Sequence, residues 1–260
     1  MISINQKKLI KSLAQKKYRE RHGMFLLEGD KLIRNALEQN HVNPVKINHV
    51  WASEEWISSL PDLPEFSSGL ITSATAEELV SVSLLVTSPG VIATAEIPTN
   101  EFSHSILKDE FTLVLDSIRD PGNMGTIIRT ADWFGFKNII CSEDCVDVFN
   151  PKVVQASMGA VLRIQPSYQS LPNIITEAKR MKIQIFGTTM HGEDYIDTFI
   201  KRPAMLVFGN ESSGISPEVI KLLDKEILIG NIPNHNMGSE SLNVGSSLAI
   251  ICAELRRRGI

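Results

Sequence analysis

The hydrophobic positions of this 260-residue chain fall into short apolar runs and amphipathic stripes, most clearly after residue 110. Apolar runs of this length predict strands, and stripes with a period of three to four residues predict helices. Buried strands that alternate with helices are typical of a parallel sheet covered on both faces. The strand candidates are 111–118, 137–142, 160–164, 182–189, 204–210 and 225–230, and the helix candidates are 124–134, 151–159, 173–181, 217–224 and 247–258.

A second, smaller pattern precedes this one. Residues 24–29, 47–52, 69–74 and 90–97 are strand candidates, and residues 30–40 have the apolar stripe of a helix. The polar stretch that follows breaks the periodicity and predicts a linker. The chain is therefore predicted to be an α/β protein with a smaller N-terminal α/β domain (1–98), a linker (99–109) and a C-terminal domain with a mostly parallel sheet (110–260).

Composition agrees with an ordinary soluble globular protein, since 43% of residues are hydrophobic and 22% are charged. No apolar run reaches the roughly 18 residues that a membrane-spanning helix needs. The first residues lack the apolar segment of a secretory signal. We therefore expect a cytoplasmic protein whose three cysteines, Cys141, Cys145 and Cys252, are reduced.

Charge is distributed unevenly along the chain. The first 40 residues hold nine Lys or Arg against four Asp or Glu, an excess of five positive charges. Because the whole chain has a formal net charge of −4, the other 220 residues carry nine excess negative charges. The basic segment predicts contacts with RNA phosphates by Lys16, Lys17, Arg19 and Arg21. The alternative is the solvated face of an amphipathic helix.

Several common site motifs are absent from the sequence. It contains neither the GxGxxG of dinucleotide-binding folds nor the GxxxxGK[ST] of P-loop NTPases. The GxSxG elbow of hydrolases is also missing. Cys141 and Cys145 have no second pair of ligands nearby in the sequence that would complete a zinc site, so no metal is expected.

Three polar segments follow predicted strands and carry the candidate chemistry. In the first, 120–135, Asn123 and Arg129 could present an amide and a guanidinium to a phosphate or a ribose. The alternative is a capped helix with a surface arginine.

The second segment, 206–216, places Glu211 between Gly209 and Gly214, which allow a close approach of the backbone. The third, 232–257, is a long polar loop that enters a helix at Ser241 and Asn243. A simple turn and a helix cap are the alternatives for these two. Since ligands of parallel sheets bind beyond the carboxyl ends of the strands, the three segments are expected to converge on one pocket.

These motifs resemble those of the SpoU (TrmH-type) RNA 2′-O-ribose methyltransferases of the SPOUT superfamily. The first motif matches in Asn123 followed six residues later by Arg129, and the other two match in the family's order. The matching residues of the second motif are Gly209, Asn210, Glu211 and Gly214, and those of the third are Ile232, Pro233, Ser241, Leu242 and Asn243. Residues 25–33 are similar to the N-terminal substrate-binding domain of many members.

The resemblance implies a deep trefoil knot, a homodimer with the site near its interface, and S-adenosylmethionine as methyl donor. It implies an RNA substrate, and ribosomal RNA more than tRNA. The catalytic residues that it implies are Asn123, Arg129, Glu211 and Asn243. The implied cofactor-binding residues are Thr188, Phe208, Gly209, Asn210, Gly214, Ile229, Ile232, Pro233, Ser241 and Leu242.

The resemblance leaves two roles open for Arg129. It could act as the base for the ribose hydroxyl with a phosphate as relay, or it could steady the forming alkoxide and clamp a phosphate. The second role is physically simpler, because a guanidinium holds its proton above pH ~12. A non-catalytic RNA-binding protein with the same fold, a base methyltransferase and a small-molecule binder are the alternative functions.

Overall fold

The computed structural model describes residues 1–38, 45–60, 69–87, 89–99, 102–230 and 241–259. The chain divides into two compact units. The first contains Met1–Thr99 and Asp147–Arg163, and the second contains Asn100–Val146 and Ile164–Ile260. The segment Asp147–Arg163, which the sequence placed in the C-terminal domain, therefore belongs to the first unit. In the described part of the chain, no helix is long and apolar enough to cross a bilayer.

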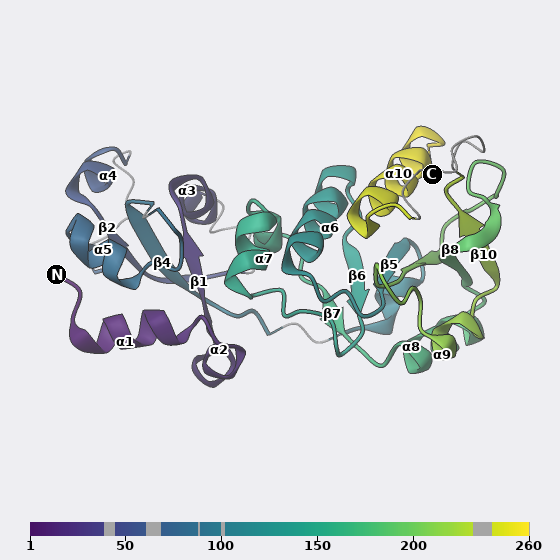
Figure 1. The fold of residues 1–260 in the computed structure, drawn as a ribbon, viewed down its shortest axis with the longest axis horizontal. Coiled ribbons are helices and arrows are strands. Elements are labelled where there is room, and N and C mark those ends of the chain that lie inside the picture. Colours follow the sequence, from purple (N-terminus) through teal and green to yellow (C-terminus); the bar gives the residue numbers. More distant parts are fainter. Residues whose placement is uncertain (39–44, 61–68, 88, 100–101, 231–240, 260) are drawn as a thin grey trace. The chain divides into compact units, whose positions relative to one another are not determined.

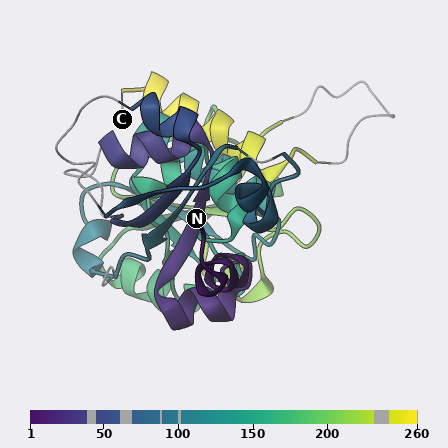
Figure 2. The ribbon, with the colours of Figure 1, turned by 90° about the vertical axis from the view of Figure 1, so that its left-hand side faces the viewer.

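The first unit is built on a four-stranded sheet with the order β1-β4-β2-β3. β4 runs antiparallel to β1 and β2, and β3 is parallel to β2. Figure 2 shows α1 end-on and α3 on opposite sides of these strands. The bounds of the elements are α1 Ile4–Ser12, α2 Lys16–His22, β1 Met24–Glu28, α3 Asp30–Glu38, β2 Ile47–Ala52, α4 Glu54–Ser58, β3 Ile71–Ser73, α5 Ala76–Val82, β4 Val91–Glu96, α7 Pro151–Ala156 and the 3-10 turn η3 Ala160–Leu162.

The alternation of β1 explains how both faces of this sheet are covered. Leu26 packs with α1 and α5 in one buried cluster. Phe25, one residue earlier, points to the other face, and its ring lies 4.6 Å from that of Phe149. The four predicted strands of this unit are confirmed by β1 to β4.

A buried ion pair ties the segment Asp147–Arg163 to the N-terminal residues. Arg19 is only 2% exposed, and its guanidinium donates to the Asp147 carboxylate and to the carbonyls of Leu13 and Ala14. The Gln155 amide donates to the Glu28 carbonyl at 2.7 Å. These contacts explain why Asp147–Arg163 folds with the first unit.

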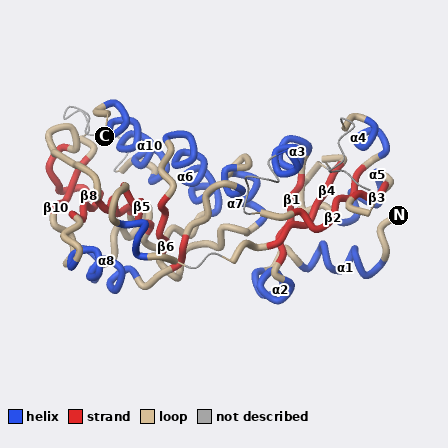
Figure 3. Tube along the Cα trace, turned by 180° about the vertical axis from the view of Figure 1, so that it is seen from behind, coloured by secondary structure: helices blue, strands red, loops and turns tan. Residues whose placement is uncertain are grey.

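The second unit contains a six-stranded sheet with the order β10-β8-β9-β5-β6-β7, in which every recorded strand pair is parallel. Helices cover both faces, with α6 and α10 on one side and α8 and α9 on the other (Figures 1 and 3). The bounds are η2 His104–Leu107, β5 Phe111–Leu115, α6 Pro121–Phe134, β6 Asn138–Cys141, β7 Ser167–Tyr168, α8 Leu171–Arg180, β8 Gln184–Asp194, β9 Ala204–Phe208, α9 Pro217–Ile220, β10 Lys225–Leu228 and α10 Val244–Arg257.

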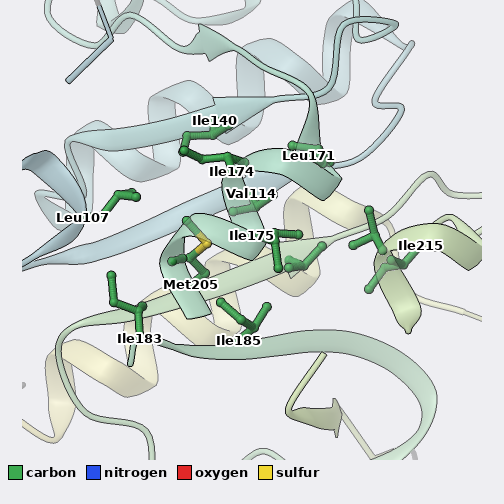
Figure 4. Packing of buried hydrophobic residues seen from close by; sticks show 13 residues of the cluster. Leu107, Val114, Ile140, Leu171, Ile174, Ile175, Ile183, Ile185, Met205 and Ile215 are labelled. Carbon is green, nitrogen blue, oxygen red and sulfur yellow. The ribbon is translucent and has the colours of Figure 1, made fainter. Parts of the chain in front are cut away.

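The core of this unit lies between the central strands and α8. All five residues of β5 and of β9 are buried, as expected for strands covered on both faces. Ile174 and Ile175 of α8 pack against Val114 and Met205 (Figure 4). The predicted α/β fold with a parallel sheet is confirmed.

One predicted strand is wrong. The run 160–164 instead contains the 3-10 turn η3, Ala160–Leu162, which lies in the first unit and is buried. Gly159, with φ at +92°, directs the chain into this turn. A short apolar run cannot by itself distinguish a buried strand from a buried turn. The edge strand β7 was not predicted, because it has only two residues.

We expect that Arg19→Leu destabilises the first unit by about 3 kcal/mol, because it leaves the Asp147 carboxylate and two carbonyls without a cationic partner. The midpoint of urea unfolding measures this effect. Arg21→Leu is the matched control, since Arg21 is exposed on the same helix and should cost less than about 0.5 kcal/mol. Equal losses in the two variants would contradict a structural role for Arg19.

Candidate active site

The loop after β5 enters α6 through a side-chain cap. The Asp120 carboxylate accepts from the backbone N–H of Asn123 at 2.8 Å, and Pro121 stands at the first helical position. Because Asp120 caps the helix, Asn123 is the third helical residue and its side-chain amide is not used for capping. That amide is available to link the loops around it.

Asn123 joins the three predicted segments. Its side-chain N–H donates to the carboxylate of Glu211, from the loop after β9. Its side-chain oxygen accepts from the amide of Asn243, the N-cap of α10, at 2.8 Å. Three of the four predicted catalytic residues therefore lie together, although they are up to 120 positions apart in the sequence.

Asn243 is fixed by its own helix. Its side-chain oxygen accepts from the backbone N–H groups of Gly245 and Ser246, at 2.9 and 3.3 Å. α10 packs beside α6, and a Cβ at Gly245 would lie 3.1 Å from the methyl of Thr126. The small residue at this position lets the start of α10 approach α6. Ser241 and Leu242, just before the cap, are exposed.

Arg129, the fourth predicted catalytic residue, does not join this group within the chain. It follows Asn123 by six positions, which places it about 120° around the helix and about 9 Å along its axis. Its side chain is exposed, and among the described residues none makes a hydrogen bond or ion pair with it. The group around Asn123 thus consists of amides and one carboxylate.

The loop after β9 is closed by backbone pairing. Asn210 and Gly214 form an antiparallel bridge with N–O distances of 3.0 and 2.9 Å. A Cβ at Gly209 would lie 2.2 Å from the carbonyl carbon of Gly214, so a larger residue would force this bridge apart. The Asn210 side-chain oxygen accepts from the backbone N–H groups of Ser212 and Ser213. These contacts give the loop a defined shape that presents Glu211.

A buried carboxylate that the sequence analysis did not select holds two loops together. Asp116 directly follows β5, is 3% exposed, and accepts from the backbone N–H of Ser216 at 2.8 Å. The Asn210 amide donates to the carbonyl of the next residue, Ser117, at 2.9 Å. The sequence signal for this anchor was an aspartate within the otherwise mostly apolar strand candidate 111–118.

Ser117 itself has an unusual backbone conformation. Its φ is +58°, which is uncommon for a residue with a side chain. Its N–H donates to the Ser142 hydroxyl, and its own hydroxyl donates to the Asp144 carboxylate at 2.8 Å. The hydroxyl of Ser142 lowers the pKa of Asp144 to about 2, with smaller contributions from Arg119 and Ser117. These hydrogen bonds fix the turn at Ser117, whose carbonyl accepts from the Asn210 amide.

Of the remaining predicted cofactor-binding residues, the structure describes Thr188, Phe208 and Ile229, which lie toward the carboxyl ends of the strands. Thr188 follows the last pair between β8 and β9, Gly187 with Val207, and its hydroxyl donates to the Val207 carbonyl. Phe208 is buried at the end of β9, and Ile229 is half-buried after β10. Ile232 and Pro233 lie outside the described residues. The parallel order β10-β8-β9-β5 places the carboxyl ends of these strands at one edge.

The structure separates the four predicted RNA-binding residues into two kinds. Lys16, Lys17 and Arg21 are exposed on α2 and remain available to phosphates. Arg19 is buried and its guanidinium is occupied by Asp147 and two carbonyls. The prediction that Arg19 contacts RNA is therefore corrected, because its charge is neutralised inside the first unit.

Two family models match this chain. The model of the SpoU rRNA methylase family matches residues 110–253, more than half of the chain. The model of the MRM3-like substrate binding domain matches residues 5–93. Together they account for both sequence patterns, the larger parallel α/β pattern and the smaller one before it.

Individual relatives cover nearly the whole chain. It is 32% identical to a Synechocystis protein described as an uncharacterized tRNA/rRNA methyltransferase, over 96% of this chain and 90% of the relative. It is 28% identical to the Bacillus subtilis 23S rRNA (guanosine(2553)-2′-O)-methyltransferase RlmP, over 95% and 94%. The SpoU methyltransferase AviRb from Streptomyces viridochromogenes, solved with the cofactor AdoMet, has a TM-score of 0.81 and 25% identity over 98% of each chain.

Proposed function

Because the chain belongs to the SpoU rRNA methylase family, we propose that it transfers a methyl group from S-adenosylmethionine to a ribose 2′-hydroxyl of ribosomal RNA. The observation that carries this proposal is the bridge of Asn123 to Glu211 and Asn243 at the carboxyl edge of the sheet. The 2′-O specificity named for the Bacillus subtilis relative and the AdoMet in the AviRb structure support it. The MRM3-like match of the first unit supports RNA as the substrate.

The residues at this edge fit the methyl donor. The loop after β9 offers amides, hydroxyls and one carboxylate, which suit ribose hydroxyls and a positively charged ligand. A Cβ at Gly214 would meet nothing within 4 Å, so there is open space beside the loop. The residues that would hold the donor are Gly209, Asn210, Gly214, Ser241 and Leu242, with Thr188, Phe208 and Ile229 from the neighbouring strands and Ile232 and Pro233 beyond the described residues.

The chemistry can be divided among the residues of the chain. S-adenosylmethionine, when bound, supplies an electrophilic methyl group on a sulfonium. Asn123 donates to one oxygen of Glu211, and among the described residues none donates to the other, Oε2, which could accept a hydrogen bond from a ribose hydroxyl. Because both partners of Asn123 are fixed before substrate binds, the ribose can be oriented with little further ordering. Arg129 would clamp the neighbouring phosphate and steady the alkoxide as the hydroxyl loses its proton.

The function is tested with labelled S-adenosylmethionine and unmodified ribosomal RNA, followed by mapping of 2′-O-methyl positions. The chain is expected to label one ribose. Arg129→Ala should reduce transfer at least 100-fold, since it removes one charge-stabilising group, while donor affinity by calorimetry stays within twofold. Lys221→Ala, which removes an exposed cation elsewhere, is the control. Label on a base, or an unlabelled RNA despite donor binding, would contradict the proposal.

We extend the proposal to a homodimer that forms over the outer face of α6. Trp133 is 84% exposed and lies four residues after Arg129, so both side chains share one side of the helix. Tryptophan and arginine are both enriched in protein–protein interfaces, so an exposed Trp133 beside Arg129 indicates a contact surface. Sedimentation velocity should show a particle of two copies, and Trp133→Lys should give single copies. A wild-type chain that stays single at micromolar concentration would contradict the dimer.

Three further features belong to the proposal. The exposed Lys16, Lys17 and Arg21 would contact RNA phosphates, which a loss of RNA affinity in their triple alanine variant tests. Family membership supports the trefoil knot, which a crystal structure of the chain tests through the path of residues 110–260. The cytoplasmic location stays a prediction, which fractionation of cells tests.

A further inference from the structure

A cavity of about 280 Å³ lies at the opposite edge of the six-stranded sheet from the candidate active site. It is lined by the first residues of β5 and β6, Phe111 and Asn138, and by Arg202, which precedes β9. Because the strands are parallel, this is the amino-terminal edge, about one strand length or roughly 17 Å from the carboxyl ends. Nothing in the proposed mechanism uses this cavity.

The cavity is strongly cationic. Lys137, Arg202 and Arg256 line it together with a single carboxylate, that of Glu110. Arg202 pairs with Glu110 through Nη1 at 3.1 Å. Two of the three positive charges therefore have no acidic counterpart within the lining.

Both guanidinium groups are positioned by contacts that leave donors unused. The Arg256 Nε donates to the carbonyl of Phe134, and its guanidinium lies over the ring of Phe136. A Cβ at Gly135 would lie 2.4 Å from Arg256 Nη2, so glycine makes room for this group. Among the described residues neither Nη atom of Arg256 has a hydrogen-bond acceptor.

Arg202 indicates more specifically than Arg256 that the cavity binds an anion. Its guanidinium lies over the Phe111 ring, 5.6 Å from the centroid. Its Nε is buried and has no hydrogen-bond partner among the described residues. A buried donor without an acceptor is unfavourable, so an anion that reaches Nε would relieve this cost.

We propose that Lys137, Arg202 and Arg256 form a phosphate-binding site that holds a backbone phosphate of the bound RNA. Guanidinium forks match the geometry of phosphate oxygens, and a lysine adds a point charge. The volume is at the small end for ligand pockets, which fits one phosphate group better than a whole nucleotide. This inference rests on the proposed function for the identity of the RNA, whereas the phosphate chemistry stands by itself.

The first part of the test measures RNA affinity against salt concentration for Lys137→Gln and Arg256→Gln, with an unmodified ribosomal RNA transcript. Each variant should reduce the slope of log affinity against log salt by about 0.7, the value for one lost phosphate contact. Lys201→Gln is the matched control, because Lys201 is exposed next to Arg202 and does not line the cavity. An equal change in the control would overturn the site.

The second part uses inorganic phosphate alone, compared with chloride at the same ionic strength. Phosphate should raise the thermal unfolding midpoint of the wild-type chain, and Arg256→Gln should lose that shift. If phosphate raises the unfolding midpoint but the variants leave the salt dependence of RNA affinity unchanged, the site does not bind an RNA phosphate. That result would assign it to a free phosphorylated molecule. No shift and no slope change would overturn the site itself. A failure of methyl transfer leaves the phosphate measurement unaffected, so the two proposals fail separately.

Discussion

Parallel pairing is the constraint on which the candidate site depends. The strands β10, β8, β9 and β5 are neighbours and run parallel, so the segments that follow them leave the sheet at one edge. Asn123 then uses both ends of its amide, donating to Glu211 and accepting from Asn243. One side chain thereby links segments that the sequence separates by as many as 120 positions.

The anchoring groups and the proposed reacting groups are different residues. Asp116 and Asn210 hold the loop after β9 from inside the structure, through Ser216 and Ser117. Glu211 stays exposed in the same loop and can accept a ribose hydroxyl. Since buried hydrogen bonds fix the backbone, the exposed carboxylate can face substrate without having to stabilise the fold. The proposed phosphate site follows a similar principle, because aromatic rings position the guanidinium groups of Arg202 and Arg256, and each keeps at least one donor without an acceptor among the described residues.

Much of the fold could be predicted because an apolar run of strand length indicates a strand that is buried on both faces. The strands β5 and β9 are buried throughout, as the apolar runs predicted, and the structure shows that they are neighbours at the centre of the sheet. The run 160–164 failed because the same apolar signal describes a buried turn. The place of Asp147–Arg163 in the first unit could not be predicted, because it depends on long-range pairs such as Arg19 with Asp147.

The candidate site likewise contains residues that the sequence identified and residues that it could not identify. The motifs identified Asn123, Glu211 and Asn243, and the structure brings them together. Charge along the chain could not separate the buried Arg19 from its exposed neighbours, because burial depends on tertiary contacts. Asp116 was overlooked because a carboxylate that binds a backbone N–H carries no motif of its own.

The central claim is that the three loops act as one unit through Asn123. A double-mutant cycle of Asn123→Ala and Glu211→Ala, read out as kcat/KM for methyl transfer, tests it most directly. Residues joined in one hydrogen-bond network should show a coupling energy of about 1 kcal/mol or more, so the double variant should lose less than the product of the single losses. Losses that multiply without coupling would contradict the claim.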